Sequence, residues 1–153
     1  MKRKFLSLAL ATAMVLGIVA GPASVFAAPE NTQTKTITLL HTNDVHGHVA
    51  AEYGKDKKLT NIGYARVKTY ADSIKNSVLL DAGDTTHGTA IAGIENGKGV
   101  IDLMKAMGYK AMVPGNHDFN YGYNALVDFK NQAAPAKGSA EGFDILAANI
   151  IKN

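Results

Sequence analysis

The chain has 153 residues, of which 46% are hydrophobic, and it contains no cysteine. The length suits one domain with a single core, and the lack of cysteine excludes disulfides, thiolate metal sites and a cysteine nucleophile. The formal net charge of +3 comes from Lys2, Arg3 and Lys4, because the residues after Ala27 include 13 basic and 13 acidic side chains. We therefore expect no nucleic-acid polymer as a partner, since such binders carry a basic surface.

Residues 1–27 have the layout of a secretory signal peptide. Basic residues 2–4 precede an apolar run from Phe5 to Ala20, and Val25 and Ala27 provide small residues at positions −3 and −1 before Ala28. A membrane anchor is the alternative, because the apolar run is close to the lower limit for a span. We expect cleavage before Ala28, export to the cell exterior, cell wall or periplasm, and no stable membrane insertion afterwards.

Residues 28–35 are polar and predict a linker, and the remaining residues, 36–153, alternate between strand-like and helix-like segments. Short β-prone apolar runs predict strands at 37–40, 78–80, 111–113 and 145–148. Apolar residues at helical spacing predict helices over 67–74, over 100–107 with Gly108 as C-cap, and from 123 onward. Regular alternation of strand and helix predicts an α/β fold with parallel strands.

Polar residues that can bind metal follow each of the first three predicted strands. These clusters are Asp44-Val45-His46-Gly47-His48, Gly83-Asp84-Thr85-Thr86-His87 and Gly115-Asn116-His117-Asp118. In open α/β sheets, ligands bind at the carboxyl ends of the strands, so we expect the three loops to meet at one site. Any single cluster is also typical of an ordinary turn; the three together favour a metal site.

The residue types in these clusters indicate a site for two divalent cations. Residues two apart on an extended chain project to the same side, so Asp44 and His46 are expected to bind one cation. The Asp84 carboxylate has two oxygens that two ions can share, and Asn116 offers a neutral oxygen to the second ion. The adjacent His117 is better placed to contact substrate. A mixture of carboxylate, imidazole and amide ligands suits Zn, Mn, Fe or Co.

Other polar residues near the clusters are weaker candidates for a role at the expected metal site. His48 and His87 border the expected site, where they contact phosphate, support the ligands or lie in solvent. Asp81 is expected to orient backbone amides near Asp84, and His41 to lie on the packing face of its strand.

The segments HTNDVHGH, LLDAGDTTHGT and VPGNHDFNYG resemble the motifs of the calcineurin-like metallophosphoesterases, and more narrowly the secreted 5′-nucleotidase and 2′,3′-cyclic-nucleotide phosphodiesterase branch. The resemblance implies a four-layer α-β-β-α sandwich and a nucleotide or cyclic-nucleotide substrate. It also implies Asp44 and His46 on one metal, Asp84 bridging, Asn116 on the other metal, and His117 stabilising the transition state.

The chain departs from this family at residue 120. Many 5′-nucleotidases of the family have a carboxylate there that pairs with the histidine, whereas this chain has Asn120. Cyclic-nucleotide phosphodiesterase/3′-nucleotidase members often have asparagine at that position, which favours that group. Asp118 is the nearest other carboxylate, and it either replaces the missing partner or caps the following helix. Asp118 and Asn120 are also candidates to support the metal ligands or to contact the substrate.

A second departure is that no histidine follows His117. The family completes its metal site with later histidines and usually adds a C-terminal domain that binds the nucleoside. We therefore expect residues 36–153 to be the N-terminal, incomplete part of a metallophosphoesterase domain, weakly active or inactive alone. The alternatives are a non-catalytic exported module that binds metal or nucleotide, and a relative of the UDP-sugar hydrolase type.

Overall fold

The computed structural model describes residues 34–151. The chain divides into two units, Met1–Lys35 and Thr36–Asn153, and the helices and strands given below belong to the second. The signal peptide predicted for residues 1–27 and most of the linker predicted for 28–35 lie outside the described residues. Among the residues that are described, no helix combines the length and apolar character needed to cross a membrane.

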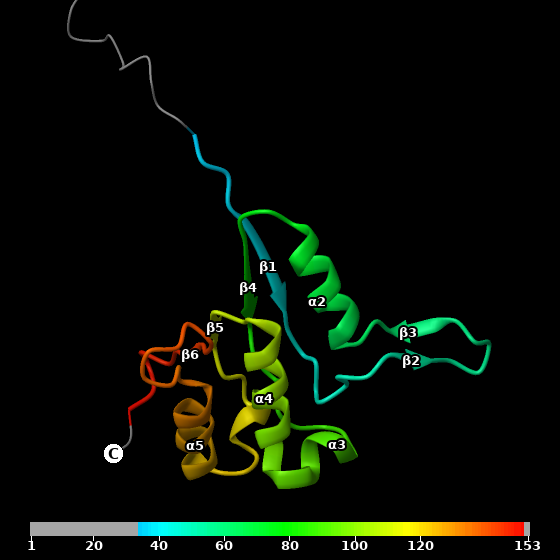
Figure 1. Ribbon diagram of the computed structural model, residues 1–153. Coiled ribbons are helices and arrows are strands. Elements are labelled where there is room, and N and C mark those ends of the chain that lie inside the picture. Colours follow the sequence, from blue (N-terminus) through cyan, green and yellow to red (C-terminus); the bar gives the residue numbers. More distant parts are fainter. Residues whose placement is uncertain (1–33, 152–153) are drawn as a thin grey trace, which may run out of the picture. The chain divides into compact units, whose positions relative to one another are not determined.

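Four parallel strands form the sheet that organises the second unit (Figure 1). They are β1 (Thr38–Thr42), β4 (Ser77–Asp81), β5 (Ala111–Met112) and β6 (Asp144–Ile145), in the order β1-β4-β5-β6. The register pairs Thr42 with Asp81, and Asp81 with Met112, at the carboxyl ends. The predicted α/β fold with parallel strands is confirmed, and each of the four strands overlaps its predicted segment.

Helices α2 (Tyr64–Ser73), α4 (Lys98–Met107) and α5 (Tyr123–Ala133) each connect one strand to the next. Each connection leads from one strand to its neighbour in the same direction along the sheet. Because crossovers between parallel strands are right-handed, the three helices lie on the same face of the sheet. Gly108 ends α4 with a φ of 83°, which confirms the C-cap that was predicted for it. Shorter elements complete the unit: α3 (Ala90–Gly93), η1 (Ile94–Gly97) and η2 (His117–Phe119).

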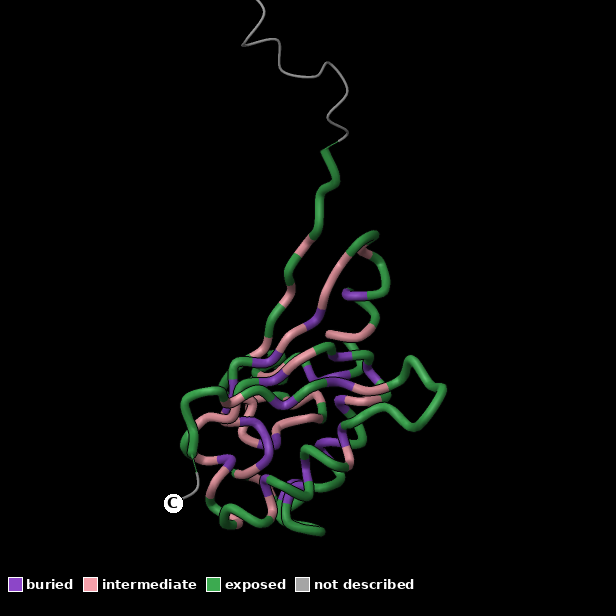
Figure 2. Tube along the Cα trace, turned by 90° about the vertical axis from the view of Figure 1, so that its left-hand side faces the viewer, coloured by how far each residue is buried: buried purple, intermediate pink, exposed green. Residues whose placement is uncertain are grey.

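The core lies between the sheet and these helices. Leu79, Met112 and Ile145 face the helices from the strands, and Met104 and Phe129 are among the buried side chains that pack against the sheet from α4 and α5. In Figure 2 the buried stretches gather where strands and helices pack, with exposed turns around them. The predicted stripe on α4 is correct at Val100, Met104 and Met107, whereas Leu103 lies partly in solvent.

The opposite face of the sheet is bare within residues 34–151. Leu39, Val113 and Leu146 expose 67%, 53% and 53% of their surface there. Apolar side chains on both faces are typical of a sheet that is covered on both sides. The described residues thus form one helix layer and one sheet layer, two of the four layers that the resemblance implies. His41 is exposed and lies with Leu39 on the bare face, so its expected place on the packing face was wrong.

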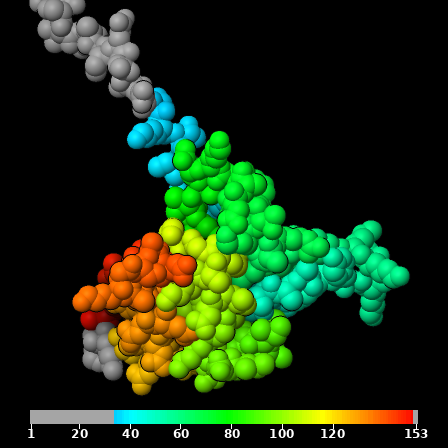
Figure 3. Space-filling view, viewed as in Figure 1, coloured from blue at the N-terminus to red at the C-terminus, as the bar shows by residue number. Residues whose placement is uncertain are grey.

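A hairpin that the sequence did not reveal follows the first polar cluster. Strands β2 (Glu52–Tyr53) and β3 (Leu59–Asn61) pair antiparallel and project away from the sheet and helices (Figures 1 and 3). Two-residue and three-residue strands are too short for a periodic pattern, and the lysine-rich turn between them resembles a solvated loop.

Candidate metal centre

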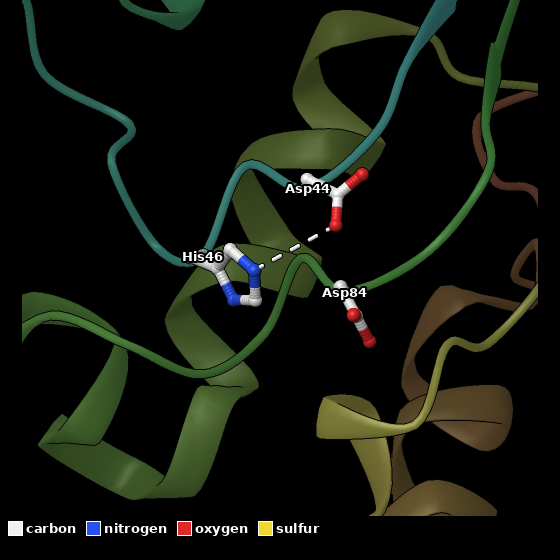
Figure 4. Close-up of side chains that lie close together, drawn as sticks. All are labelled: Asp44, His46 and Asp84. Atoms are coloured by element: carbon white, nitrogen blue, oxygen red, sulfur yellow. Dashed lines mark ion pairs between the residues drawn. The ribbon is translucent and has the colours of Figure 1, made fainter.

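Asp44, His46 and Asp84 meet at the carboxyl ends of β1 and β4 (Figure 4). One potential ligand atom from each of the three side chains lies within 4.8 Å of the other two. The Nε2 atom of His46 is 3.7 Å from Asp44 Oδ1, and Asp84 enters from the neighbouring loop. The predicted convergence of the first two clusters is therefore present in the structure.

Backbone hydrogen bonds between the two loops produce this convergence. Beyond the last paired residues of β1 and β4, the Asp44 N–H donates to the Gly83 carbonyl at 2.9 Å, and the His46 N–H donates to the Asp84 carbonyl at 2.9 Å. The loops thus continue the pairing of the strands in an irregular form. Each of the three side chains is positioned by main-chain contacts, which do not depend on the side chains themselves.

All three side chains stand on left-handed backbone. The φ angles of Asp44, His46 and Asp84 are 52°, 47° and 56°, a region that residues other than glycine rarely adopt and that costs of order 1–3 kcal/mol each. The reasoning that Asp44 and His46 share a side because they lie on an extended chain was therefore wrong. A turn, rather than a strand, brings them together, and strain of this kind concentrates at functional sites.

The third loop contacts the same site through its backbone. The N–H of His117 donates to Asp84 Oδ1 at 2.8 Å, which places the turn that contains Asn116 against Asp84. Gly115 permits this approach, because a Cβ atom there would collide with the Asp84 carboxylate. The His117 ring meets the His46 ring edge-on, with centroids 5.2 Å apart. All three predicted loops thus reach one site.

Asp118 is completely buried and holds the loop that carries Asp84. Its Oδ2 atom accepts from the N–H groups of Asp84 and Gly115 at 2.9 and 2.8 Å. Its Oδ1 atom accepts from the N–H groups of Thr85 and Thr86, and from the Thr86 hydroxyl at 2.8 Å. Two of the roles expected for Asp118 were wrong: its carboxylate neither pairs with an imidazole nor caps α5, because these N–H and hydroxyl donors occupy both of its oxygens. Its contacts are instead those of a residue that supports the Asp84 loop.

The Asp81 side chain also supports the loop that carries Asp84. Its carboxylate accepts from the Gly83 N–H at 2.9 Å, from the Thr42 hydroxyl at 2.6 Å and from the Thr85 hydroxyl at 2.9 Å. The predicted role in orienting backbone near Asp84 is confirmed. Burial raises the pKa of Asp81 to about 6, although these hydrogen bonds act in the opposite direction.

His48 lies apart from the three converging side chains and pairs with Glu52 on β2. The Nδ1 atom of His48 is 2.6 Å from Glu52 Oε1. A pocket of about 320 Å³ opens between this segment and the start of α2, with Asp44 and Asn61 among its lining residues. The sequence placed His48 at the border of the site, but it gave no signal for Glu52, whose partner depends on the unpredicted hairpin.

His87 and Asn120 both contact the His117 side chain. The amide Nδ2 atom of Asn120 is 3.0 Å from Nδ1 of His117 and 3.2 Å from Nδ1 of His87. The sequence named both residues but not this contact. The sequence analysis did not identify Thr85 and Thr86 as supporting residues, although both are fully buried. Their position directly after Asp84 was the one sequence feature that could have indicated this role.

The donor set fits a divalent cation. No lysine or arginine within residues 34–151 forms an ion pair with Asp44 or Asp84, so the charge of the two carboxylates is not neutralised by such side chains. The second oxygen of Asp84 has no hydrogen-bond partner among the described residues. Two carboxylates and an imidazole, held by main-chain contacts around a common point, are suitable ligands for a first-row divalent metal.

Comparison with known proteins gives a consistent family. Residues 37–153 match the calcineurin-like phosphoesterase family. The chain is 33% identical to a 2′,3′-cyclic-nucleotide 2′-phosphodiesterase/3′-nucleotidase of Haemophilus influenzae, over 88% of this chain and 21% of that protein. It is 35% identical to protein UshA of Salmonella pullorum, over 96% of this chain and 26% of that protein.

A solved structure shares the fold. The 5′-nucleotidase precursor of Thermus thermophilus superimposes with a TM-score of 0.60 at 32% identity, over 74% of this chain and 22% of that one. The chain thus spans about a fifth to a quarter of the length of these relatives. With its parallel sheet, its three converging loops and a family match over residues 37–153, the chain belongs to the calcineurin-like phosphoesterase family.

Proposed function

We propose that this chain contributes the first half of a two-metal site that hydrolyses phosphoesters of nucleotides. The observation that carries the proposal is the meeting of Asp44, His46 and Asp84 within 4.8 Å, on strained backbone and without a lysine or arginine partner among the described residues. The relatives named as a 2′,3′-cyclic-nucleotide 2′-phosphodiesterase/3′-nucleotidase and as a 5′-nucleotidase precursor support the substrate class.

In this proposal each ligand has its own role. Asp44 and His46 would hold one cation, Asn116 would provide a neutral oxygen to the second, and Asp84 would be shared by both. Asp84 is suited to bridging because one carboxylate oxygen accepts from the His117 N–H, which fixes the orientation of the group. When bound, a pair of divalent cations supplies the positive charge that activates a water molecule and offsets the charge of the phosphoryl group.

His117 is the proposed catalytic side chain. Its ring contacts His46 and its backbone contacts Asp84, so a phosphoryl group held at the cluster lies within its reach. An imidazole N–H donates a hydrogen bond to a phosphoryl oxygen, or to the oxygen of the departing alcohol, and so stabilises the charge that develops there.

Metal binding tests the core of the proposal. Calorimetric titration of the protein with Mn²⁺ and Zn²⁺, combined with metal analysis, should show binding that Asp84→Asn weakens by about tenfold or more. Asp72→Asn is the matched control, because Asp72 is an exposed carboxylate that pairs with Lys68 on α2. Unchanged metal content in Asp84→Asn contradicts the bridging role.

Activity is tested on the 153-residue chain and on any longer product of its reading frame. We expect metal-dependent hydrolysis of a chromogenic phosphodiester, and a panel of 2′,3′-cyclic AMP, 3′-AMP, 5′-AMP and a UDP-sugar defines the specificity. Asn120 in place of a carboxylate favours the cyclic nucleotide and 3′-AMP. Metal binding without hydrolysis by any product identifies a binding module instead.

Export is the remaining part of the proposal. It rests on the basic residues, apolar run and small residues of positions 2–27. N-terminal sequencing of the protein recovered outside the cytoplasm should begin at Ala28. A protein retained in the cell with its first residues intact contradicts export.

A further inference from the structure

Three imidazole rings, those of His46, His117 and His87, lie next to one another at the metal centre. The rings of His46 and His117 meet edge-on with centroids 5.2 Å apart. The rings of His117 and His87 are nearly parallel, at 9°, with centroids 6.0 Å apart. His117 therefore contacts both other rings, whereas no ring contact joins His87 to His46 within residues 34–151.

One amide group orients the rings of His117 and His87. The Nδ2 atom of Asn120 lies 3.0 Å from His117 Nδ1 and 3.2 Å from His87 Nδ1. An amide nitrogen has two hydrogens and no acceptor lone pair, so it donates to both Nδ1 atoms. A neutral imidazole whose Nδ1 accepts carries its proton on Nε2. Both rings therefore present an Nε2–H donor on the side away from Asn120.

The loop holds His87 firmly without using this donor. The preceding Thr86 is buried and donates to Asp118, and a Cβ atom at Gly88 would collide with the His46 backbone. The Tyr121 ring packs against His87 with centroids 5.4 Å apart, and its hydroxyl donates to the Ala92 carbonyl at 3.3 Å. Within residues 34–151, Nε2 of His87 has no hydrogen-bond partner, and the side chain is partly open to solvent.

We propose that His87 is a second substrate-binding imidazole, whose Nε2–H donates to an oxygen on the alcohol part of a phosphate ester, such as a ribose oxygen of a nucleotide. This inference rests on the proposed function, because it takes the phosphoryl group to lie at the metal centre beside His117. His87 contacts His117 but is not one of the three converging side chains, so its Nε2–H is available to the part of the substrate next to the phosphoryl group. The residue determines specificity and does not act on the phosphoryl group.

Binding of two ligands separates this role from the others. The protein is loaded with Mn²⁺, and dissociation constants are measured by calorimetry for 3′-AMP and for inorganic phosphate. We expect His87→Ala to weaken 3′-AMP binding by about tenfold, the effect of one lost hydrogen bond, and to change phosphate binding by less than about twofold. His87→Gln should recover most of the affinity, because its amide offers an N–H donor at a similar reach.

His41→Ala is the matched control, since His41 is an exposed histidine on the bare face of the sheet, and it should leave both constants unchanged. Equal weakening of 3′-AMP and phosphate by His87→Ala overturns the proposal and assigns His87 to the phosphoryl group. Unchanged binding of both ligands also overturns it. If the unmodified protein with Mn²⁺ binds neither ligand, the proposed function fails before any variant is compared, and the two failures are thereby distinguished.

Thermal unfolding of each variant accompanies these titrations. An unchanged unfolding midpoint in His87→Ala shows that a lost affinity comes from the missing donor. If His87→Ala unfolds early, His87→Gln and a His87→Phe variant decide the question: the first keeps a donor and the second keeps only the packing against Tyr121. Weak 3′-AMP binding in the Phe variant with normal binding in the Gln variant supports the proposal, and equal binding in both contradicts it.

Discussion

The buried carboxylate of Asp118 accepts a hydrogen bond from the backbone N–H of Asp84 at 2.9 Å. The same carboxylate accepts from Thr85, Thr86 and Gly115, so the loops after β4 and β5 are joined through one side chain. A residue that the sequence left between two weak alternatives is therefore the structural link between the Asp84 loop and the His117 turn.

Removing that link should affect both stability and metal binding. Asp118→Ala leaves four backbone N–H groups and one hydroxyl without their acceptor, and we expect the free energy of unfolding to fall by about 3 kcal/mol or more. Asp118→Asn retains one acceptor oxygen and should lose less, while binding Mn²⁺ about tenfold more weakly. Denaturant unfolding and calorimetry measure the two effects. Asp72→Ala is the surface control, and a similar loss in that variant contradicts the special role of Asp118.

Two glycines make a matched pair for the packing of the site. Gly115→Ala introduces a Cβ that collides with the Asp84 carboxylate, whereas a Cβ at Gly99, in α4, meets nothing within 4 Å. We expect Gly115→Ala to weaken metal binding and to destabilise the fold. Gly99→Ala should stabilise the fold by about 0.5–1 kcal/mol, because alanine favours a helix. Normal metal affinity in Gly115→Ala would show that Asp84 does not need its observed position.

The stability of the fold should depend on pH through Asp81. Burial raises its pKa in the folded chain to about 6 from an ordinary value of 3.8, so proton binding favours the folded state. This contribution is present in full below about pH 4 and is lost as the pH rises through 6, by about 3 kcal/mol in total.

Asp81→Asn removes this titration. Denaturant unfolding of both proteins between about pH 4 and pH 7 should show that the gap between their free energies of unfolding changes across this range and is level on either side of it. A gap that stays constant from acid to neutral pH contradicts the raised pKa. The absolute stability of Asp81→Asn is a poorer measure, since the variant also replaces one of the two carboxylate oxygens that accept from Gly83 and Thr42 with an amide nitrogen that cannot accept.

His117→Ala tests the catalytic assignment. In the active product of the reading frame, we expect turnover of the chromogenic phosphodiester to fall by about two to four orders of magnitude, because a positioned hydrogen-bond donor is lost. The metal content should stay unchanged, since only the backbone of His117 contacts Asp84. Turnover equal to that of the His41→Ala control removes His117 from catalysis.

Asn120→Asp reverses the hydrogen bonds that orient the two imidazoles. A carboxylate only accepts, so it requires a proton on Nδ1 of the rings that it contacts, whereas the amide of Asn120 leaves the proton on Nε2. Nitrogen-15 NMR at about pH 8, above the ordinary imidazole pKa of about 6.5, distinguishes these tautomers. We expect Nε2–H in His117 and His87 of the unmodified protein and Nδ1–H in His117 of the variant; the same tautomers in both proteins would contradict the assigned contact.

Much of the fold follows from local sequence patterns. Four apolar runs and three helical stripes, each bounded by polar or glycine residues, predicted every strand of the main sheet and each of its three connecting helices. The hairpin from Glu52 to Asn61 escaped prediction because its strands are too short to show alternation. The side of β1 on which His41 lies also escaped, since apolar residues occupy both faces of that strand.

The site was predictable in composition but not in its supporting contacts. Asp44, His46 and Asp84 were named because their residue types follow neighbouring strands, and parallel strands end at one edge. Asp and His are enriched on left-handed backbone, but most of them lie elsewhere, so residue type alone did not locate this conformation. The roles of Asp118 and Asn120 depend on partners 32–34 residues away, a distance over which residue spacing carries no information.

The amino-acid sequence alone determined the kind of protein: a parallel α/β unit, with candidate metal ligands placed after each of three successive strands. Periodicity and residue type suffice for these conclusions, because backbone geometry and ligand chemistry act locally. The tertiary structure decided which side chains touch. In the folded chain Asp118 is buried among backbone N–H donors, and His87 and His117 share hydrogen bonds to the amide of Asn120. Such long-range contacts are selected by the packing of the whole unit and not by any single segment of it.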